Sequence, residues 1–201
     1  GQPTKHKHIH SAAGKATQSE VYSYSYDYAD RLQTTTHCLN NGPVMTLVNN
    51  EYDELGRLKH NRRNGQSNLH TNYGYNLRSW TESISSPLFC ETLYYNDTRS
   101  NPTNTRYYNG NISGMDWSVN GDKKRGYDFS YDNLSRLLYA DYLENNIRNH
   151  NFNTSYNYDK QGNIVSLMRS GNQNTTYGII DNLTLNYRGN QLIKVEDTAS
   201  D

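Results

Sequence analysis

The clearest pattern along the chain is an alternation of tyrosines with small polar residues. Tyr22, Tyr24 and Tyr26 fall on one side of an extended segment, and the residues between them fall on the other side. A period of two residues is typical of a β-strand, because successive side chains of a strand point to opposite faces. Runs of β-compatible residues at 137–139 and 164–167 fit the same interpretation. The pattern therefore predicts short strands.

A seven-residue motif recurs along the chain, Tyr-Asp-x-x-(Gly/Asp/Ser)-(Arg/Asn)-(Leu/Ile). Four full copies occupy residues 26–32, 52–58, 131–137 and 158–164. Shortened variants begin at Tyr75, Tyr108 and Tyr187, and residues 94–97 resemble a degenerate copy. These units cover nearly everything after residue 20, so the chain is predicted to consist of repeats rather than of one irregular domain.

Each copy has the chemistry of a hairpin turn. An aspartate at the first turn position can accept a hydrogen bond from the backbone two residues on, and a glycine at the fourth can take the left-handed conformation. We expect positive φ at Gly56 and Gly162, whereas Ser135 predicts a distorted turn. The predicted turn residues are Tyr26, Asp27, Tyr52, Asp53, Gly56, Tyr131, Asp132, Tyr158, Asp159 and Gly162.

Short isolated hairpins are marginal in water, so the hairpins must pair edge to edge. The sequence predicts an all-β fold in which repeated antiparallel β-hairpins form a curved, twisted or spiralling sheet. Residues 1–20 are predicted to be a polar arm or a partial strand. Residues 21–201 are predicted to be a single domain with an irregular segment at about 76–130, where the period of the repeat is broken.

Composition supports a folded chain without an excess of charge. The 201 residues include 19 Tyr, 28 Asn and 14 Gly, and the formal net charge is zero. Tyrosine is therefore expected to supply much of the buried surface, while Asn and Gly supply turns. A neutral chain argues against a general binder of nucleic acid or of anionic membranes. No stretch approaches 18 apolar residues, so no membrane span is expected.

The motifs at 52–58 and 158–164 resemble the YD repeats of the RHS (rearrangement hotspot) family, and the resemblance extends over about residues 20–196. The Asn-rich and Tyr-rich spacers resemble versions from Bacteroidetes. Members of this family are large bacterial surface or secreted proteins, and animal teneurins carry related repeats. The resemblance implies a β-strip that, in full-length relatives, spirals into a hollow shell around a C-terminal toxin. About eight units are too few to close such a shell, so the chain is expected to be a piece of a larger protein.

Candidate chemistry is sparse in this sequence. His6, His8 and His10 lie on one side of a predicted strand and could offer imidazoles to a metal ion, but an exposed polar arm explains them better, and no metal site or cofactor is predicted. The recurrent aspartates occupy one turn position, which favours capping over catalysis. No nucleophile elbow and no phosphate-binding loop occur, so the chain is predicted not to be an enzyme. Cys38 and Cys90 are compatible with a bridge or with free thiols.

The sequence therefore predicts a non-enzymatic structural segment, a scaffold or shell wall of an RHS-type protein at the bacterial surface or outside the cell. The alternative is a glycan-binding adhesin module with a tyrosine-lined groove, since aromatic faces stack on sugars and amides bond their hydroxyls. The expected partner is the rest of its own parent protein, and nucleic acid is not expected. Unpaired edge strands at the ends of the repeats also predict one of two outcomes: residues 1–20 fold back over one edge, or two copies pair edge to edge as a homodimer.

Overall fold

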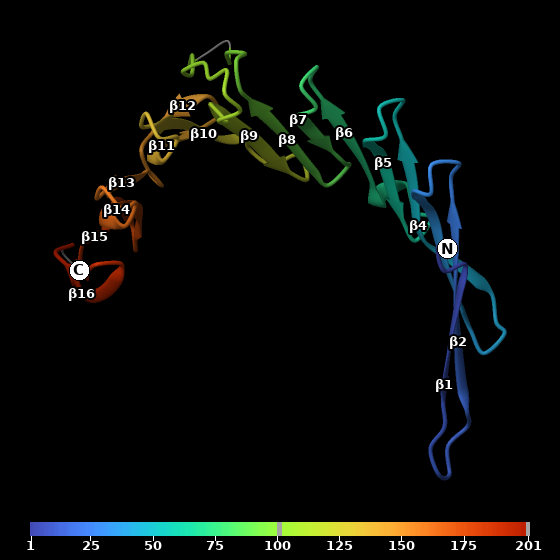
Figure 1. Cartoon of the computed structure of the whole chain (residues 1–201). Helices are drawn as coiled ribbons and strands as arrows, with labels where there is room; N and C mark the ends of the chain where they lie inside the picture. The colour runs from blue at the N-terminus through green and yellow to red at the C-terminus, as the bar shows by residue number, and fades with distance from the viewer. Residues whose placement is uncertain (100–101, 200–201) are drawn as a thin grey trace. The chain divides into compact units, whose positions relative to one another are not determined.

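The fold is built almost entirely from β-strands. The computed structural model describes residues 1–99 and 102–199. In that part of the chain there are sixteen β-strands and one short 3-10 helix, η1 (Ser67–Leu69) (Figure 1). Strands whose register is defined pair antiparallel with their neighbours in sequence, except that β11 pairs with β13 as well as with the intervening β12. The predicted all-β fold of repeated antiparallel hairpins is confirmed.

The chain forms two compact units, Gly1–Cys90 and Glu91–Asp201. The boundary between them lies inside the segment 76–130 that the sequence predicts to be irregular. The prediction of a single domain from residue 21 onwards stays a prediction, because two compact units do not tell whether they fold together.

The first unit contains seven complete strands that follow one another in the sheet in sequence order. They are β1 (Lys5–His10), β2 (Gln18–Tyr26), β3 (Leu32–Leu39), β4 (Val44–Tyr52), β5 (Leu58–Arg63), β6 (His70–Tyr75) and β7 (Thr81–Ser85). Residues 1–20 thus contain β1 and the start of β2. The loop between β1 and β2 projects beyond the neighbouring β3–β4 loop (Figure 1).

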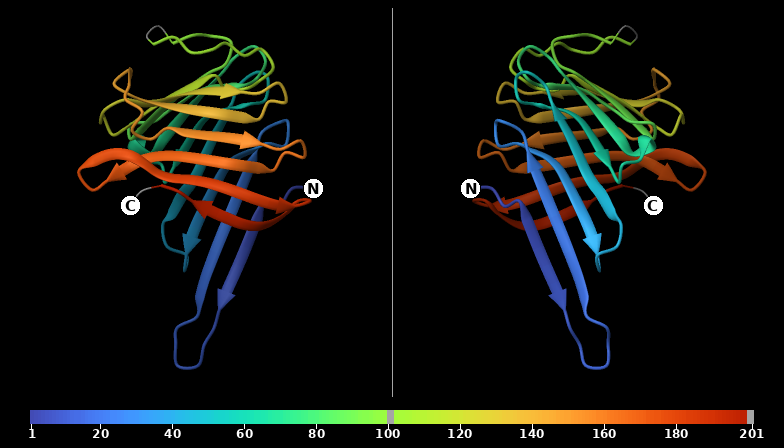
Figure 2. Two further views of the ribbon diagram at one scale, coloured as in Figure 1. Left: turned by 90° about the vertical axis from the view of Figure 1, so that its left-hand side faces the viewer. Right: turned by 90° about the vertical axis from the view of Figure 1, so that its right-hand side faces the viewer.

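The strand β8 (Phe89–Tyr94) crosses the boundary, and the remaining strands belong to the second unit. They are β9 (Gly114–Val119), β10 (Arg125–Tyr131), β11 (Leu137–Glu144), β12 (Ile147–Arg148), β13 (Thr154–Tyr158), β14 (Ile164–Gln173), β15 (Thr176–Arg188) and β16 (Gln191–Asp197). The short β12 pairs only with β11. Figure 2 shows the twist of the long strands β14 to β16, drawn in orange and red.

A register shift recurs at the tyrosine that opens each motif. In the first copy Ser25 faces Thr34 but Tyr26 faces Leu32, so Gln33 is an extra residue on the returning strand. The same shift occurs before Tyr52, Tyr75, Tyr131, Tyr158 and Tyr187. A bulge of this kind increases the local twist of a hairpin. The repeated motif therefore repeats a twist as well as a turn.

Fully buried side chains are concentrated in the second unit. The buried apolar residues among those described are Tyr95, Ala140, Tyr142 and Leu143, and the buried polar ones are Arg99, Asn104, Ser113, Asp116, Asp128 and Asn153. The loop between β8 and β9 contributes several of them. Most other residues of both units are half-buried or exposed, as expected for a sheet without a covering layer.

Candidate functional site

The turn of the motif is held together by its aspartate. In the second copy the Asp53 carboxylate accepts hydrogen bonds from the amides of Leu55 and Arg57, at 3.0 and 2.9 Å. The other carboxylate oxygen pairs with the Arg57 guanidinium at 2.7 Å. The backbone closes the turn through the Gly56 amide, which donates to the Asp53 carbonyl. One side chain thus satisfies two backbone donors and anchors the arginine of its own turn.

The other copies repeat this geometry. Asp27, Asp132 and Asp159 accept the same pair of backbone bonds, and each bonds the side chain four residues on, Arg31, Arg136 or Asn163. The fourth turn position has positive φ in every copy, from 58° at Asp30 and 61° at Ser135 to 82° at Gly56 and 95° at Gly162.

Two details of the sequence interpretation are wrong. Ser135 predicts a distorted turn, but it adopts the left-handed conformation, and the turn keeps its hydrogen bonds. The copy at Tyr75 looks shortened in the sequence, but Asn76 accepts amide bonds from Arg78 and Trp80 as the aspartates do. It is a full-length copy in which an amide oxygen replaces the carboxylate.

Four motif tyrosines reach back to the preceding motif, whereas Tyr26 of the first copy donates to the Pro3 carbonyl. The hydroxyl of Tyr52 donates to the carbonyl of Leu32 at 3.0 Å, and Leu32 is the last residue of the preceding copy. Corresponding bonds run from Tyr75 to Leu58, from Tyr131 to Ile112 and from Tyr158 to Leu137, at 2.7 to 2.9 Å. The Ile112 carbonyl belongs to the variant that begins at Tyr108. Each bond ties one hairpin to the next, within the unit that contains it.

The arginine of each motif reaches forward. The guanidinium of Arg31 lies over the ring of Tyr52, 4.6 Å from its centroid, and Arg57 and Arg136 lie in the same way over Tyr75 and Tyr158. Arg136 also donates to the Asp159 carbonyl at 3.0 Å. A cation over an aromatic face is attracted by the ring quadrupole. We call this set of contacts the Tyr-Asp-Arg ladder, made of the motif tyrosines, the turn aspartates and the arginines that bridge to the next motif.

The ladder favours ionised aspartates. Burial opposes ionisation at Asp53, but hydrogen bonds from Arg57 and Leu55 outweigh it and lower the pKa of the Asp53 carboxyl. At Asp132 the backbone bond from Arg136 is the largest cause of a lowered pKa. At Asp159 the Asn163 side chain is the largest cause, and the pKa is again lowered. Burial raises the pKa of Tyr131 to about 12, so its hydroxyl stays a donor. The groups are tuned for hydrogen bonding rather than for proton transfer near neutral pH.

A second polar cluster lies in the second unit. The Arg99 guanidinium is buried and pairs with the carboxylates of Asp116, at 2.7 Å, and Asp128. Lys124 adds a contact of 2.7 Å to Asp116, and Arg148 adds one of 2.6 Å to Asp128. Arg148 also pairs with Asp141, which accepts a contact from His150. We call the group around Arg99, Asp116 and Asp128 the Arg99 cluster.

Two glycines make room for this cluster. A Cβ atom on Gly126 would lie 2.5 Å from the Asp116 carboxylate, and one on Gly114 would lie 3.0 Å from the Asp128 carboxylate. Burial opposes ionisation of Asp116, but bonds from Arg99 and Lys124 outweigh it and lower the pKa of its carboxyl. The Tyr94 hydroxyl donates to Asp116 at 2.9 Å. The charges balance one another inside the cluster, which indicates an anchor for the loop that carries Arg99.

The comparisons with known proteins bear on the fold. No family model and no curated protein matches the chain. A chain of the solved structure "TcdB2-TccC3 without hypervariable C-terminal region" is similar over 90% of this chain and 10% of its own length, with a TM-score of 0.60 and 16% identity. A chain of "TcdB2-TccC3-TEV" is similar over the same shares, with a TM-score of 0.51 and 9% identity.

These structures therefore share the fold of this chain. The chain spans about a tenth of the length of the chains that it matches. At identities of 16% and 9% the likeness establishes the arrangement of hairpins and carries no information on activity. It fits the RHS-like fold that the repeated motif predicts.

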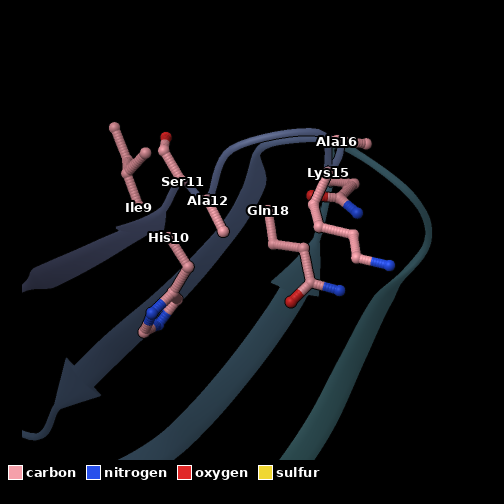
Figure 3. Close-up of a pocket in the computed structure, with 8 residues that line it drawn as sticks. Ile9, His10, Ser11, Ala12, Lys15, Ala16 and Gln18 are labelled. Carbon is pink, nitrogen blue, oxygen red and sulfur yellow. The ribbon is translucent and has the colours of Figure 1, made fainter.

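The largest groove described lies at the end of the β1–β2 hairpin. It has a volume of about 780 Å³, and its lining comes from the end of β1, the following loop, the start of β2 and Asn40 directly after β3. Figure 3 shows the residues of the β1–β2 hairpin around it. The ionisable side chains in its lining are His10 and Lys15, and no carboxylate faces them there. The groove therefore lacks the acid–base pair that most hydrolytic mechanisms use.

The described residues also bear on metal binding, disulfide bonds and membrane-spanning helices. In residues 1–99 and 102–199 no three His, Cys, Asp or Glu side chains are arranged to hold a metal ion. Cys38 and Cys90 are both free thiols. No helix of the described chain is long and apolar enough to cross a membrane.

The sequence interpretation missed the Arg99 cluster. Arg99, Asp116 and Asp128 lie apart from one another in the segment that breaks the repeat, and none of the three belongs to a motif copy. One signal was present: the tripeptide Gly-x-Asp occurs at 114–116 and again at 126–128. On neighbouring antiparallel strands this spacing places two carboxylates and two glycines on one face. Two carboxylates that are buried together need a cation between them, and the glycines leave room for it.

Proposed function

We propose that the chain is a non-enzymatic structural segment of a large RHS-type YD-repeat protein, a scaffold or shell wall. The observation that carries the proposal is the Tyr-Asp-Arg ladder. The motif tyrosines and arginines make the contacts that join one hairpin to the next, and the aspartate holds the arginine within its own turn. In a repeat protein each unit contacts mainly its neighbours, so residues that recur at these contacts serve to extend the sheet.

The comparisons support the same proposal. The matched chains are about ten times longer than the aligned part, and one of them is named as lacking a hypervariable C-terminal region. A segment of a long repeat protein explains both the partial coverage and the lack of converging catalytic groups in the described grooves. On this proposal the main partner is the rest of the parent protein, and the location is the bacterial surface or the medium, as the family resemblance implies.

Electron microscopy of the parent protein, expressed from its complete gene, tests the proposal directly. We expect this segment to appear as a continuous stretch of wall, with neighbouring hairpins added at both ends of the strip. A separate module connected by linkers and projecting from the rest would overturn it.

A glycan array on the chain itself tests the alternative of an adhesin. Tyr22 and Tyr24 line a common groove of about 350 Å³, whereas the motif tyrosines named above spend their hydroxyls on backbone carbonyls. We expect no saturable glycan binding. Saturable binding that is lost in Tyr22→Ala and Tyr24→Ala would favour the adhesin.

An edge-to-edge homodimer is a further part of the proposal. Strand β16 is exposed along its whole length and contains no proline, so its outer edge offers unpaired backbone groups. Sedimentation is expected to show a concentration-dependent dimer. A strict monomer up to about 100 μM, a concentration at which a micromolar complex would be saturated, would contradict this part.

A further inference from the structure

Strand β1 presents three imidazoles on one face. His6, His8 and His10 alternate with Lys7 and Ile9, and all six residues of the strand are exposed. The rings of His6 and His8 lie 4.1 Å apart between centroids, whereas those of His8 and His10 lie 6.1 Å apart. The first two histidines therefore form a close pair, and His10 stands apart from it.

The neighbouring strand supplies a carboxylate to the same face. In the antiparallel register His8 lies opposite Glu20 and His6 lies opposite Tyr22. Residues in such positions have Cβ atoms about 4.5 to 5.5 Å apart, within reach of one another's side chains. The Tyr22 hydroxyl lies 3.4 Å from a Glu20 carboxylate oxygen, and both side chains are on this face because they are two residues apart on β2. The same groups, with His10 and Tyr24, line the groove of about 350 Å³.

Imidazole pairs of this spacing suit divalent transition metals. Zinc binds histidine nitrogen at about 2.0 to 2.1 Å, and two nitrogens on one tetrahedral ion lie about 3.3 Å apart. Nitrogens of two exposed rings with centroids 4.1 Å apart reach that separation by rotation of side chains that pack against little else. Imidazole favours Zn²⁺, Ni²⁺ and Cu²⁺ over Mg²⁺ and Ca²⁺.

We propose that His6 and His8 chelate one divalent transition-metal ion on the exposed face of β1. Glu20 adds its negative charge beside the ion, and water completes the coordination. The arrangement has two protein nitrogens rather than three preassembled ligands, which agrees with the absence of a three-residue metal group from the described chain. His37, opposite Tyr22 on β3, is separated from His6 by the width of β2 and takes no part.

Calorimetric titration of the full chain with ZnCl₂ tests the proposal. We expect one saturable site that EDTA reverses, and a loss of affinity of about tenfold or more in His6→Ala and in His8→Ala. Glu20→Gln is expected to weaken binding by about twofold to fivefold, as loss of one nearby charge at the surface does. Lys7→Ala is the matched control, because Lys7 lies on the same strand and the opposite face, and His10→Ala should change affinity by less than about threefold.

Circular dichroism of each variant shows whether the sheet is retained, which is expected because the substituted residues of β1 are exposed and Glu20→Gln keeps the size of a half-buried side chain. A second measurement is the broadening of backbone NMR signals by substoichiometric Cu²⁺, which is expected to begin at residues 6, 8 and 20. Equal losses in the three histidine variants would overturn the proposed pair in favour of an unspecific cluster. Absence of saturation below about 1 mM Zn²⁺ would overturn the site altogether.

Discussion

The Tyr-Asp-Arg ladder and the Arg99 cluster use the same chemistry in opposite ways. In the ladder, aspartate and arginine lie four residues apart, the Asp53–Arg57 pair is about one-fifth exposed, and the arrangement recurs in copy after copy. In the Arg99 cluster the partners come from distant parts of the second unit, the arginine is 3% exposed, and the arrangement occurs once in the described chain. Local pairs add small increments that a repeat multiplies, whereas removal of one partner from a buried cluster has a large cost because it leaves a buried charge unpaired.

The energetic difference follows from solvent. Water can replace part of a lost partner at a partly exposed turn, so removal of one ladder residue leaves little uncompensated charge. At Arg99 the carboxylates of Asp116 and Asp128 would remain buried without their main cation. Tolerance to substitution should therefore be high in the ladder and low in the cluster.

The largest expected effect is that of Arg99→Met. It removes the cation and leaves two buried carboxylates, so we expect a loss of about 3 to 5 kcal/mol in the free energy of unfolding. Urea denaturation followed by tyrosine and tryptophan fluorescence measures it. Lys124→Ala is the control, because Lys124 contacts the same Asp116 but is 42% exposed, and it should cost less than about 1 kcal/mol.

If Arg99→Met fails to fold, the triple variant with Asp116→Asn and Asp128→Asn keeps the comparison open. Neutral amides in place of the carboxylates are expected to recover part of the lost stability, because no unpaired buried carboxylate remains and the cations that lose these partners, Lys124 and Arg148, are exposed to water. Equal costs for Arg99→Met and Lys124→Ala would show that the cluster is no anchor.

The next effect is that of Asp53→Ala, which is expected to cost about 1 to 2 kcal/mol because two turn amides and Arg57 lose their acceptor. Asp53→Asn is the matched variant and should cost less than about 1 kcal/mol, since Asn76 shows that an amide oxygen can accept both bonds. Equal losses in the free energy of unfolding for the two substitutions would contradict the role of the Asp53 side chain as a hydrogen-bond acceptor in the turn.

The stabilising contribution of Asp53 is expected to depend on pH. The pKa of Asp53 is lowered in the folded state, so its contribution to stability is present above the unfolded pKa of about 4 and is lost as the pH falls through the folded pKa. The stability difference between the parent chain and Asp53→Ala should therefore shrink below about pH 4. Urea midpoints at pH 7, 4 and 3 measure it, and a difference that grows on acidification would contradict the assignment.

The sequence predicts the turns of the Tyr-Asp-Arg ladder but not the Arg99 cluster, because the first is local and the second is not. The ladder turns were predictable because Asp53 and Gly56 act through the backbone within four residues, and local chemistry repeats with the motif. The partners across hairpins, such as Tyr52 with Leu32, needed the strand register, which a bulge at each tyrosine sets. The Arg99 cluster depends on a loop that folds back over β9 and β10, and no local pattern fixes that path.

A smaller effect is expected for Tyr52→Phe. The substitution keeps the ring under Arg31 but removes the hydrogen bond to the Leu32 carbonyl, so it should cost about 0.5 to 1.5 kcal/mol. Tyr28→Phe is the control, because Tyr28 is 96% exposed and should change stability by less than about 0.5 kcal/mol. Thermal denaturation of both variants beside the parent chain measures the difference. If Tyr52→Phe does not change stability, the contact between Arg31 and the ring, and not the hydrogen bond, links the two hairpins.

The smallest expected effect has the opposite sign. Ser135 holds a left-handed conformation at φ 61°, which costs a side-chain-bearing residue about 1 to 2 kcal/mol. Ser135→Gly removes that strain, but it also removes the exposed hydrogen bond from Asn109 and gives back about 0.4 to 1 kcal/mol through the freer unfolded chain, so a net gain of no more than about 0.5 kcal/mol is expected. Gly162→Ala is the matched reverse, because Gly162 has φ 95° and a Cβ atom added there would meet no other atom within 4 Å, so backbone strain alone should lower stability by about 1 kcal/mol. Urea midpoints that move in opposite directions would show that the fourth turn position is selected for backbone conformation, and midpoints that move together would refute it.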